Sequence, residues 1–284
     1  MGLGRCYNRP SRDTAGRAHP SPAHQGGSHS AMTAIGRRVV RLEHRLTRPN
    51  ASLAELEAAV ALALEHECAA ITVSPWLVKA AKRAMGRSRQ RLGTVVGYPH
   101  GGQILSVKAF EASKALEQGA NQIDFVLNGG ALVSGEDEVV YNDMLAVIDM
   151  AHSALAVVGV IVEAEPLDGD LLRKACRLAE RAGADYVVTS PGEAPARRTV
   201  QRTGVLRDSV GPRVQVKASG RFRTLADVRA AASAGASLIS APFSPELARG
   251  ASESFAPAAG AGSVPPPVSV SSAPRGRVVG SRAS

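Results

Sequence analysis

The sequence predicts one closed barrel of eight parallel strands surrounded by helices, a (β/α)8 or TIM barrel. Eight short runs rich in β-branched residues alternate with longer runs rich in Ala and Leu over about 220 residues, which is typical of repeated βα units. The composition agrees, because 44% of the residues are hydrophobic but only 4% are aromatic, as in an aliphatic core. An open doubly wound sheet is the alternative, but the segment HRLTRPNAS after the first strand lacks that fold's glycine motif.

The predicted strands share two properties: they are short, and turn or helix signals bound them on both sides. A continuous apolar run of this length suits a strand of a parallel sheet that is covered by helices. In chain order they are 39–43, 70–74, 93–98, 122–127, 157–163, 185–190, 214–219 and 237–241.

The segments between the strands carry helix start and stop signals. Ser52 and Glu55 have the spacing of a capping box ahead of an apolar helix. Ser74 followed by Pro75 predicts an N-cap and a first-turn proline, and Gly86 ends that helix. The remaining predicted helices, most of which stop just before a glycine, are 104–118, 136–152, 168–182, 199–210 and 224–234.

Two tails flank the predicted domain. Residues 1–31 and 251–284 are rich in Gly, Ser, Pro and Arg or Ala without any helix or strand period, so we expect both to be disordered and 32–250 to fold as one domain. The net charge of +9 falls to +4 over 32–250, because the tails hold +3 and +2. The basic composition therefore does not argue for a nucleic-acid partner.

The sequence also predicts a cytoplasmic protein that needs no metal, cofactor or membrane. No apolar run reaches the ~18 residues of a membrane helix, and 1–31 has no signal-peptide core. Cys6, Cys68 and Cys176 are too far apart in the sequence to suggest a disulfide framework or a zinc site. Unpaired cysteines suit a reducing compartment.

Alternation along the strands predicts which polar side chains face the barrel mouth. Asp124 lies between apolar neighbours that face the helices, so it points inward, and Thr72, Ser190 and Glu163 have the same phase in their strands. Lys217 is the one lysine of six that falls in a predicted strand. A lysine there is a phosphate ligand, an ion-pair partner, an amine catalyst, or a side chain that reaches solvent past the rim. Asp124 and Glu163 also allow a purely structural ion pair.

Glycines at the carboxyl ends of strands suggest a phosphate site. The segment KASG at 217–220 leads into Arg221 and Arg223, and PHGG at 99–102 has a similar character. Open backbone N–H groups beside a helix start favour phosphate. We therefore expect Gly220 and Arg221 to bind a phosphate group.

Three stretches resemble the deoxyribose-phosphate aldolases of the DeoC-like barrel family. They are VGYPHGGQILSVKAFEASKALEQGANQIDFVLNGGALVSG at 96–135, AGADYVVTSPG at 182–192 and VGPRVQVKASGRFRT at 210–224. The resemblance covers nearly all of 40–250. It implies a TIM barrel, a homodimer, and metal-free retro-aldol cleavage of 2-deoxyribose 5-phosphate to acetaldehyde and glyceraldehyde 3-phosphate through a lysine Schiff base.

The resemblance also implies roles for individual residues. It matches Asp124 to the family's proton-transfer aspartate and Lys217 to a second lysine that lowers the pKa of the first. The Schiff-base lysine itself is replaced by Gly159, and the lysine of the family's KTSTG segment is replaced by Val188. We expect substrate or phosphate contacts from the inward and loop positions Thr72, Ser190, Gly220 and Arg221, with Glu163 as a further member.

Two hypotheses follow from these departures. The first is a catalytically altered aldolase for a small phosphorylated aldehyde or sugar, with Lys217 as nucleophile or electrostatic group and Asp124 as acid/base. The second is a non-catalytic barrel that binds a sugar phosphate or serves as a structural partner. Because neighbouring carboxylates raise a lysine pKa, Lys217 suits a charged ligand better than a free amine. The sequence therefore predicts low or absent standard activity.

Overall fold

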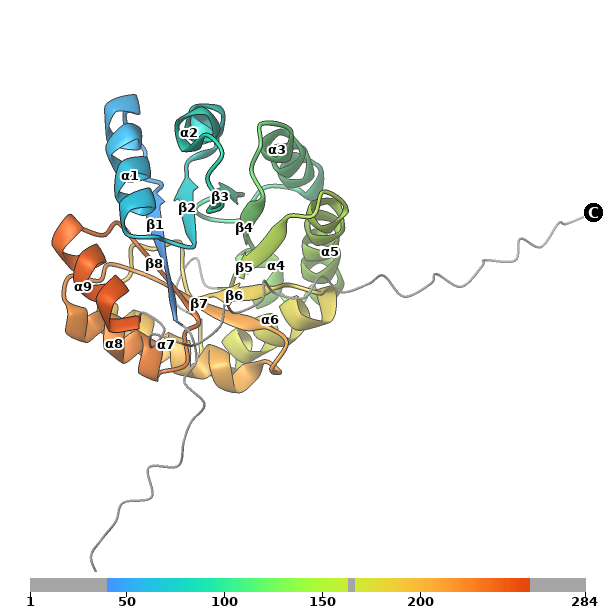
Figure 1. Cartoon of the computed structure of the whole chain (residues 1–284). Coiled ribbons are helices and arrows are strands. Elements are labelled where there is room, and N and C mark those ends of the chain that lie inside the picture. Colours follow the sequence, from blue (N-terminus) through green and yellow to red (C-terminus); the bar gives the residue numbers. More distant parts are fainter. Residues whose placement is uncertain (1–39, 163–166, 256–284) are drawn as a thin grey trace, which may run out of the picture. The chain divides into compact units, whose positions relative to one another are not determined.

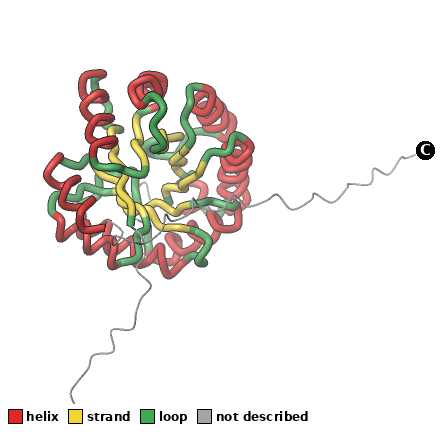
Figure 2. Tube along the Cα trace, viewed as in Figure 1, coloured by secondary structure: helices red, strands yellow, loops and turns green. Residues whose placement is uncertain are grey.

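The computed structural model describes residues 40–162 and 167–255. Eight strands form a closed parallel barrel in chain order, and β1 pairs with β8 to complete it. The strands form the inner ring and the helices lie outside it (Figures 1 and 2). This confirms the predicted (β/α)8 barrel. The strands are β1 Arg41–Leu46, β2 Ala70–Val73, β3 Arg91–Val96, β4 Gln122–Val126, β5 Val157–Ile161, β6 Tyr186–Val188, β7 Gln215–Ser219 and β8 Leu238–Ala241.

The helices follow the strands as the alternation predicts. They are α1 Leu53–Glu65, the 3-10 turn η1 Pro75–Leu77, α2 Val78–Met85, α3 Leu105–Glu117, α4 Gly129–Val133, α5 Asp137–Ser153, α6 Gly169–Ala182, α7 Ala196–Ser209, α8 Leu225–Ser233 and α9 Pro245–Phe255. No helix in the described ranges is long and apolar enough to cross a bilayer.

Most predicted helix ends lie within one residue of the structure, but α7 begins at Ala196 rather than at the predicted residue 199. Ser52 and Glu55 form the expected capping box at α1. Ser74, in contrast, makes no side-chain cap: its carbonyl accepts the Leu77 N–H, which closes a 3-10 turn before α2 begins. Pro75 occupies the first position of this turn, where a missing backbone N–H leaves no hydrogen bond unmade.

Two helices were not predicted. The short α4 begins with two glycines, which have a low helix propensity, so the sequence pattern does not predict it. Asn128 caps it by accepting the Ala131 N–H. The last helix, α9, runs past residue 250 to Phe255, and its Ala251 is fully buried. Residues 251–255 therefore belong to the barrel rather than to the predicted tail. Residues 1–31, 256–284 and Glu163 lie outside the described residues.

The core has an outer and an inner layer. The outer layer fills the space between strands and helices and includes Ile123 and Phe125 of β4. The inner layer is a smaller cluster inside the barrel, formed by Val126, Ile161, Tyr186, Val188 and Leu238. The alternation of β4 between these layers confirms that its even-numbered residues, Asp124 among them, face the interior.

Candidate active site

A buried ionic cluster lies inside the barrel, built from strands that are far apart in the sequence. The Nζ of Lys217 on β7 lies 2.8 and 2.7 Å from the two carboxylate oxygens of Asp124 on β4. It also donates to Oε2 of Glu43 on β1 at 2.8 Å. Lys217 and Glu43 are completely buried. The structure thus excludes a lysine that reaches solvent and gives Lys217 two ion-pair partners.

Glu43 is held in place by neutral donors as well. Gln122 Nε2 donates to its Oε2 at 2.6 Å, and Ser240 Oγ donates to its Oε1 at 2.7 Å. Thr72 joins the network through Gln122 Nε2, 3.4 Å from its Oγ1. Thr72 is fully buried and its side chain belongs to this interior network, while its contact with a substrate stays a prediction.

The cluster fixes the protonation states of its members. Burial would lower the pKa of Lys217, but the carboxylates of Asp124 and Glu43 outweigh burial and raise it above its usual value. Burial raises the pKa of Asp124 to about 6, opposed by Lys217 and assisted by Glu43. The pKa of Glu43 is lowered, because attraction and hydrogen bonds from Lys217, Gln122 and Ser240 together overcome its burial. At neutral pH Lys217 is therefore an ammonium ion between two carboxylates.

Position 159 borders this cluster. Gly159 pairs with Asp124 across β4 and β5, and a Cβ at 159 would lie 2.6 Å from Asp124 Oδ1 and 2.9 Å from Val188 Cγ2. Positions 159 and 188, where the resemblance implies lysines, thus lie next to each other, and position 159 borders Asp124. Neither position carries an amine in this chain, and Lys217 supplies the cation that contacts Asp124.

The backbone amides of Gly220 and Arg221, which the sequence predicts to be open for phosphate, form hydrogen bonds within the protein. The Gly220 N–H donates to the Ser240 carbonyl, and the Arg221 N–H donates to the Ala194 carbonyl, so these two amides are not open. Ser190 Oγ donates to the Ser219 carbonyl at 2.9 Å and accepts the Gly192 N–H at 3.2 Å. Ser190 therefore shapes the turn after β6.

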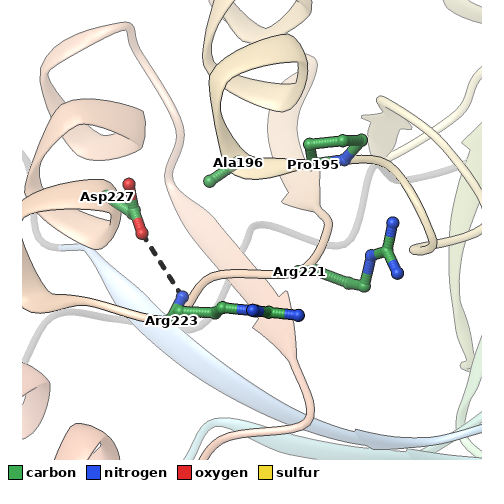
Figure 3. Close-up of a pocket in the computed structure, with 5 residues that line it drawn as sticks. All are labelled: Pro195, Ala196, Arg221, Arg223 and Asp227. Atoms are coloured by element: carbon green, nitrogen blue, oxygen red, sulfur yellow. Dashed lines mark hydrogen bonds between the residues drawn. The ribbon is translucent and has the colours of Figure 1, made fainter.

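Side chains, rather than backbone amides, form the basic surface beside β7. A cavity of about 230 Å³ is lined by Arg221, Arg223 and Asp227, together with Pro195, the N-cap of α7, and Ala196, its first residue. Figure 3 shows the two arginine side chains extending to the same side, while Asp227 turns to the backbone N–H of Arg223. The positive end of the α7 dipole adds to both guanidinium charges. This arrangement suits an anionic group.

Sequence reasoning missed several inward residues, including Gln122 and Ser240 of the network above and the buried Arg45. Arg45 lies two residues after Glu43 on β1 and is 6% exposed. Its guanidinium donates to the carbonyls of Pro191 and Gly192 at 2.8 and 2.7 Å. The period-two rule, applied from Glu43 toward the end of β1, would have found it.

A metal site is not evident in this part of the barrel. Among residues 40–162 and 167–255, no group of three or more His, Cys, Asp or Glu side chains has the geometry to hold a metal ion. What the cluster offers instead is a fixed ammonium, a carboxyl group with a raised pKa, and a basic cavity nearby.

The comparison with known families decides the lineage of this barrel. A model of the DeoC/LacD family aldolases matches residues 21–260. The chain belongs to the DeoC/LacD aldolase family.

Members of the DeoC/LacD family with curated names are similar over most of their length. The deoxyribose-phosphate aldolase of Streptococcus suis strain 98HAH33 is 39% identical over 210 residues, which cover 74% of this chain and 94% of that protein. The Bacillus cereus strain Q1 protein of the same name is 35% identical over 218 residues, covering 75% and 97%.

A solved structure agrees with this assignment. The deoxyribose phosphate aldolase from Aeropyrum pernix, described as a unique tetrameric structure, superposes with a TM-score of 0.64 at 28% identity. The match covers 76% of this chain and 90% of that one. The chain therefore shares the DeoC/LacD fold. It has Gly159 and Val188 at the two positions where the resemblance described above implies lysines.

Proposed function

We propose that this DeoC/LacD barrel is a deoxyribose-phosphate aldolase-like lyase site for a small phosphorylated sugar or aldehyde, in which the standard Schiff-base cleavage is very slow or absent. The observation that carries this proposal is the pairing of Lys217 with Asp124 and Glu43. We take the substrate class from the names of the relatives. We infer the low rate of Schiff-base cleavage from the buried ion pairs of Lys217.

Schiff-base formation needs a neutral amine that can reach the carbonyl carbon. The ammonium of Lys217 is fully buried and its pKa is raised by two carboxylates, so little free amine exists near pH 7. Gly159 and Val188 have no amine to take its place. The proposal therefore gives Lys217 an electrostatic role toward Asp124 rather than a nucleophilic one.

Asp124 retains a property useful in proton transfer. A general acid or base works best when its pKa lies near the operating pH, and burial raises the pKa of Asp124 to about 6. We assign it the acid/base role that the resemblance implies. The phosphate of the ligand is assigned to the cavity between Arg221 and Arg223, where arginine forks and the start of α7 attract an anion.

A non-catalytic, sugar-phosphate-binding barrel is the second candidate. It is favoured by the same contacts, because Lys217, Asp124 and Glu43 satisfy one another without any ligand. The described cysteines, Cys68 and Cys176, are free and buried, which is the basis for a cytoplasmic location in either case. We further propose self-association at least to a dimer, since the Aeropyrum pernix relative is described as a tetramer.

Binding and turnover together test the proposal. By calorimetry, 2-deoxyribose 5-phosphate should bind at least tenfold more tightly than 2-deoxyribose, because only the ester has a phosphate for the arginine cavity. Arg221→Ala should remove most of this difference. Arg173→Ala is the matched control, since Arg173 is an exposed arginine on α6 paired with Asp170.

Turnover is measured by acetaldehyde release, with the Streptococcus suis relative assayed in parallel. We expect a rate at least a thousandfold below that relative, because no free amine reaches the carbonyl carbon. Release within tenfold of the relative would overturn the proposal. Tight binding with no product after prolonged incubation would select the second candidate, and equal binding of sugar and ester would refute the phosphate assignment.

A further inference from the structure

Two lysines and one arginine are buried in the described part of the chain, and they differ in their partners. Lys108 on α3 contacts Asp143 Oδ2 on α5 at 2.5 Å. Lys217 contacts two carboxylates at hydrogen-bond distance, as described above. The nearest carboxylate to Arg45 is that of Glu193, whose Oε1 is 3.7 Å from Nη1 and whose side chain is 72% exposed. Arg45 is thus a buried charge without a carboxylate in hydrogen-bond contact.

The partners of Arg45 are neutral oxygens. Nη1 donates to the Pro191 carbonyl at 2.8 Å and to Thr47 Oγ1 at 3.3 Å, and Nη2 donates to the Gly192 carbonyl at 2.7 Å. Its Nε–H is buried and has no partner among the described residues. A guanidinium binds carboxylate or phosphate roughly twice as strongly as a neutral oxygen. The Glu193 carboxylate is 3.7 Å away and its side chain is mostly exposed, so an anion in hydrogen-bond contact would stabilise the buried guanidinium better than the carbonyls do.

Arg45 lies where a ligand of a TIM barrel binds. It is the last inward residue of β1, at the carboxyl end of the strands, and the turn that it contacts follows β6. The contact is close: Gly192 has φ +115°, and a Cβ there would overlap the guanidinium. Tyr98 supports the same turn by donating to the Pro191 carbonyl at 3.1 Å. Arg45 therefore holds this turn at the barrel mouth.

We propose that Arg45 binds an anionic group of the ligand, a phosphate or a carboxylate, which replaces the carbonyl oxygens of Pro191 and Gly192 on the guanidinium. This deepens the proposed function, on which it rests for the presence of a ligand in the mouth. The site differs from the cavity at Arg221 and Arg223, because Arg45 belongs to β1 and reaches the other end of the β6–α7 connection.

The alternative is that Arg45 only ties the turn down. The two roles differ in what an added anion does to the guanidinium. A structural tie leaves its Nε–H environment unchanged when anions are added, whereas a binding residue changes it saturably. The Nε–H group is a suitable reporter because it is buried and lacks a partner in the absence of ligand.

The test is a titration of the full chain followed by the arginine Nε–H signals in a ¹H–¹⁵N spectrum. Inorganic phosphate and sodium acetate are the two probes, added at constant ionic strength with chloride as the balancing salt. The Arg45 signal is identified by through-bond assignment and by its loss in Arg45→Lys. We expect a saturable shift of this signal with phosphate, with acetate, or with both, and the responding probe identifies the anion class.

Two variants complete the test. Arg45→Lys keeps the charge but loses the planar fork, so the probe that shifts the signal should bind at least tenfold more weakly by calorimetry. Arg48→Gln is the matched control, because Arg48 is a half-exposed arginine in the next loop and should leave the binding unchanged. An Arg45 signal that does not move with either probe would overturn the inference, and the wild-type titration decides this even if Arg45→Lys fails to fold.

The outcome is separable from that of the proposed function. An Arg45 shift that persists in Arg221→Ala, without any binding of 2-deoxyribose 5-phosphate, would support the Arg45 site and refute the proposed ligand. If the phosphorylated sugar binds through Arg221 while the Arg45 signal stays fixed, the proposed ligand is supported and the Arg45 site is refuted.

Discussion

Lys217 shows how neighbours decide what a lysine in a barrel can do. Its position on β7 alone allows a nucleophile, a phosphate ligand or an ion-pair partner. The 2.7–2.8 Å contacts with Asp124 and Glu43 decide between them, because each carboxylate favours the ammonium form. The same cluster leaves Asp124 as the member whose pKa is shifted to about 6.

We expect the carboxyl carbon of Asp124 to titrate near pH 6 when followed by ¹³C NMR. Because its folded pKa is raised above 3.8, the folded state binds this proton more tightly, so stability contributed here decreases as pH rises from about 4 to 6. Lys217→Met should move the midpoint above 6, since Lys217 attraction lowers it. Lys114→Met, an exposed lysine on α3, should not. A midpoint near 4 in the wild type would contradict this account.

Some site residues could be predicted from the sequence and others could not. The inward direction of Asp124 and Lys217 follows from alternation within one strand. Glu43 has an inward phase by the same rule, but its contact with Lys217 could not be predicted, because it depends on β1 closing against β8 and no local pattern encodes that register. Arg45 shares the phase of Glu43, but only the folded turn after β6 shows what it contacts.

At the scale of elements, an ion pair behind β4 links α3 to α5. Lys108 Nζ contacts Asp143 Oδ2 at 2.5 Å and donates to the Val126 carbonyl at 3.2 Å, and its ammonium lies 4.8 Å from the centre of the Phe125 ring. Burial lowers the pKa of Lys108 and raises that of Asp143, while their mutual attraction opposes both shifts. The pair therefore ties two helices to the strand that carries Asp124.

Removing one member of this pair should cost more than removing both. Lys108→Met and Asp143→Leu should each lower the free energy of unfolding by about 3 to 5 kcal/mol, because each leaves a buried charge alone. The double variant should lose clearly less than the sum. Urea unfolding measures all three, with Lys114→Met as the exposed control. Strictly additive losses would show that the two side chains do not act as a pair.

Element boundaries were predictable where capping and glycine signals were strong. The capping box of α1 and Gly183 after α6 are of this kind, and the structure reproduces both. The start of α4 was not predictable, since Gly129 and Gly130 disfavour helix and tertiary packing overrides them. In α9 the buried positions Ala248 and Ala251 are alanines, which give a weak apolar signal.

For the whole molecule, alternation was enough to predict a closed eight-stranded barrel, but it ended the domain at residue 250, inside α9. Ser252 Oγ of α9 donates to the His66 carbonyl after α1, so the last helix joins the ends of the barrel. This contact and the burial of Ala251 place 251–255 in the folded unit. We propose that the independently stable domain is 32–255.

Truncated chains test this boundary. Residues 32–255 should unfold within about 0.5 kcal/mol of the full chain, because this range keeps every described strand and helix. Ending the chain at 244 should lower the free energy of unfolding by about 2 kcal/mol or more, since α9 then no longer covers β1 and α8. Chemical denaturation gives both values. Equal stability of the two truncated chains would contradict a structural role for α9.

The central claim is that Lys217 is a paired ammonium and not a Schiff-base nucleophile. Borohydride trapping with acetaldehyde, followed by peptide mass mapping, tests it most directly, because reduction fixes any imine as a stable secondary amine. Lys217 should remain unmodified, at or below the background seen on the exposed Lys114. Near-stoichiometric adduct on Lys217 at neutral pH would contradict the account.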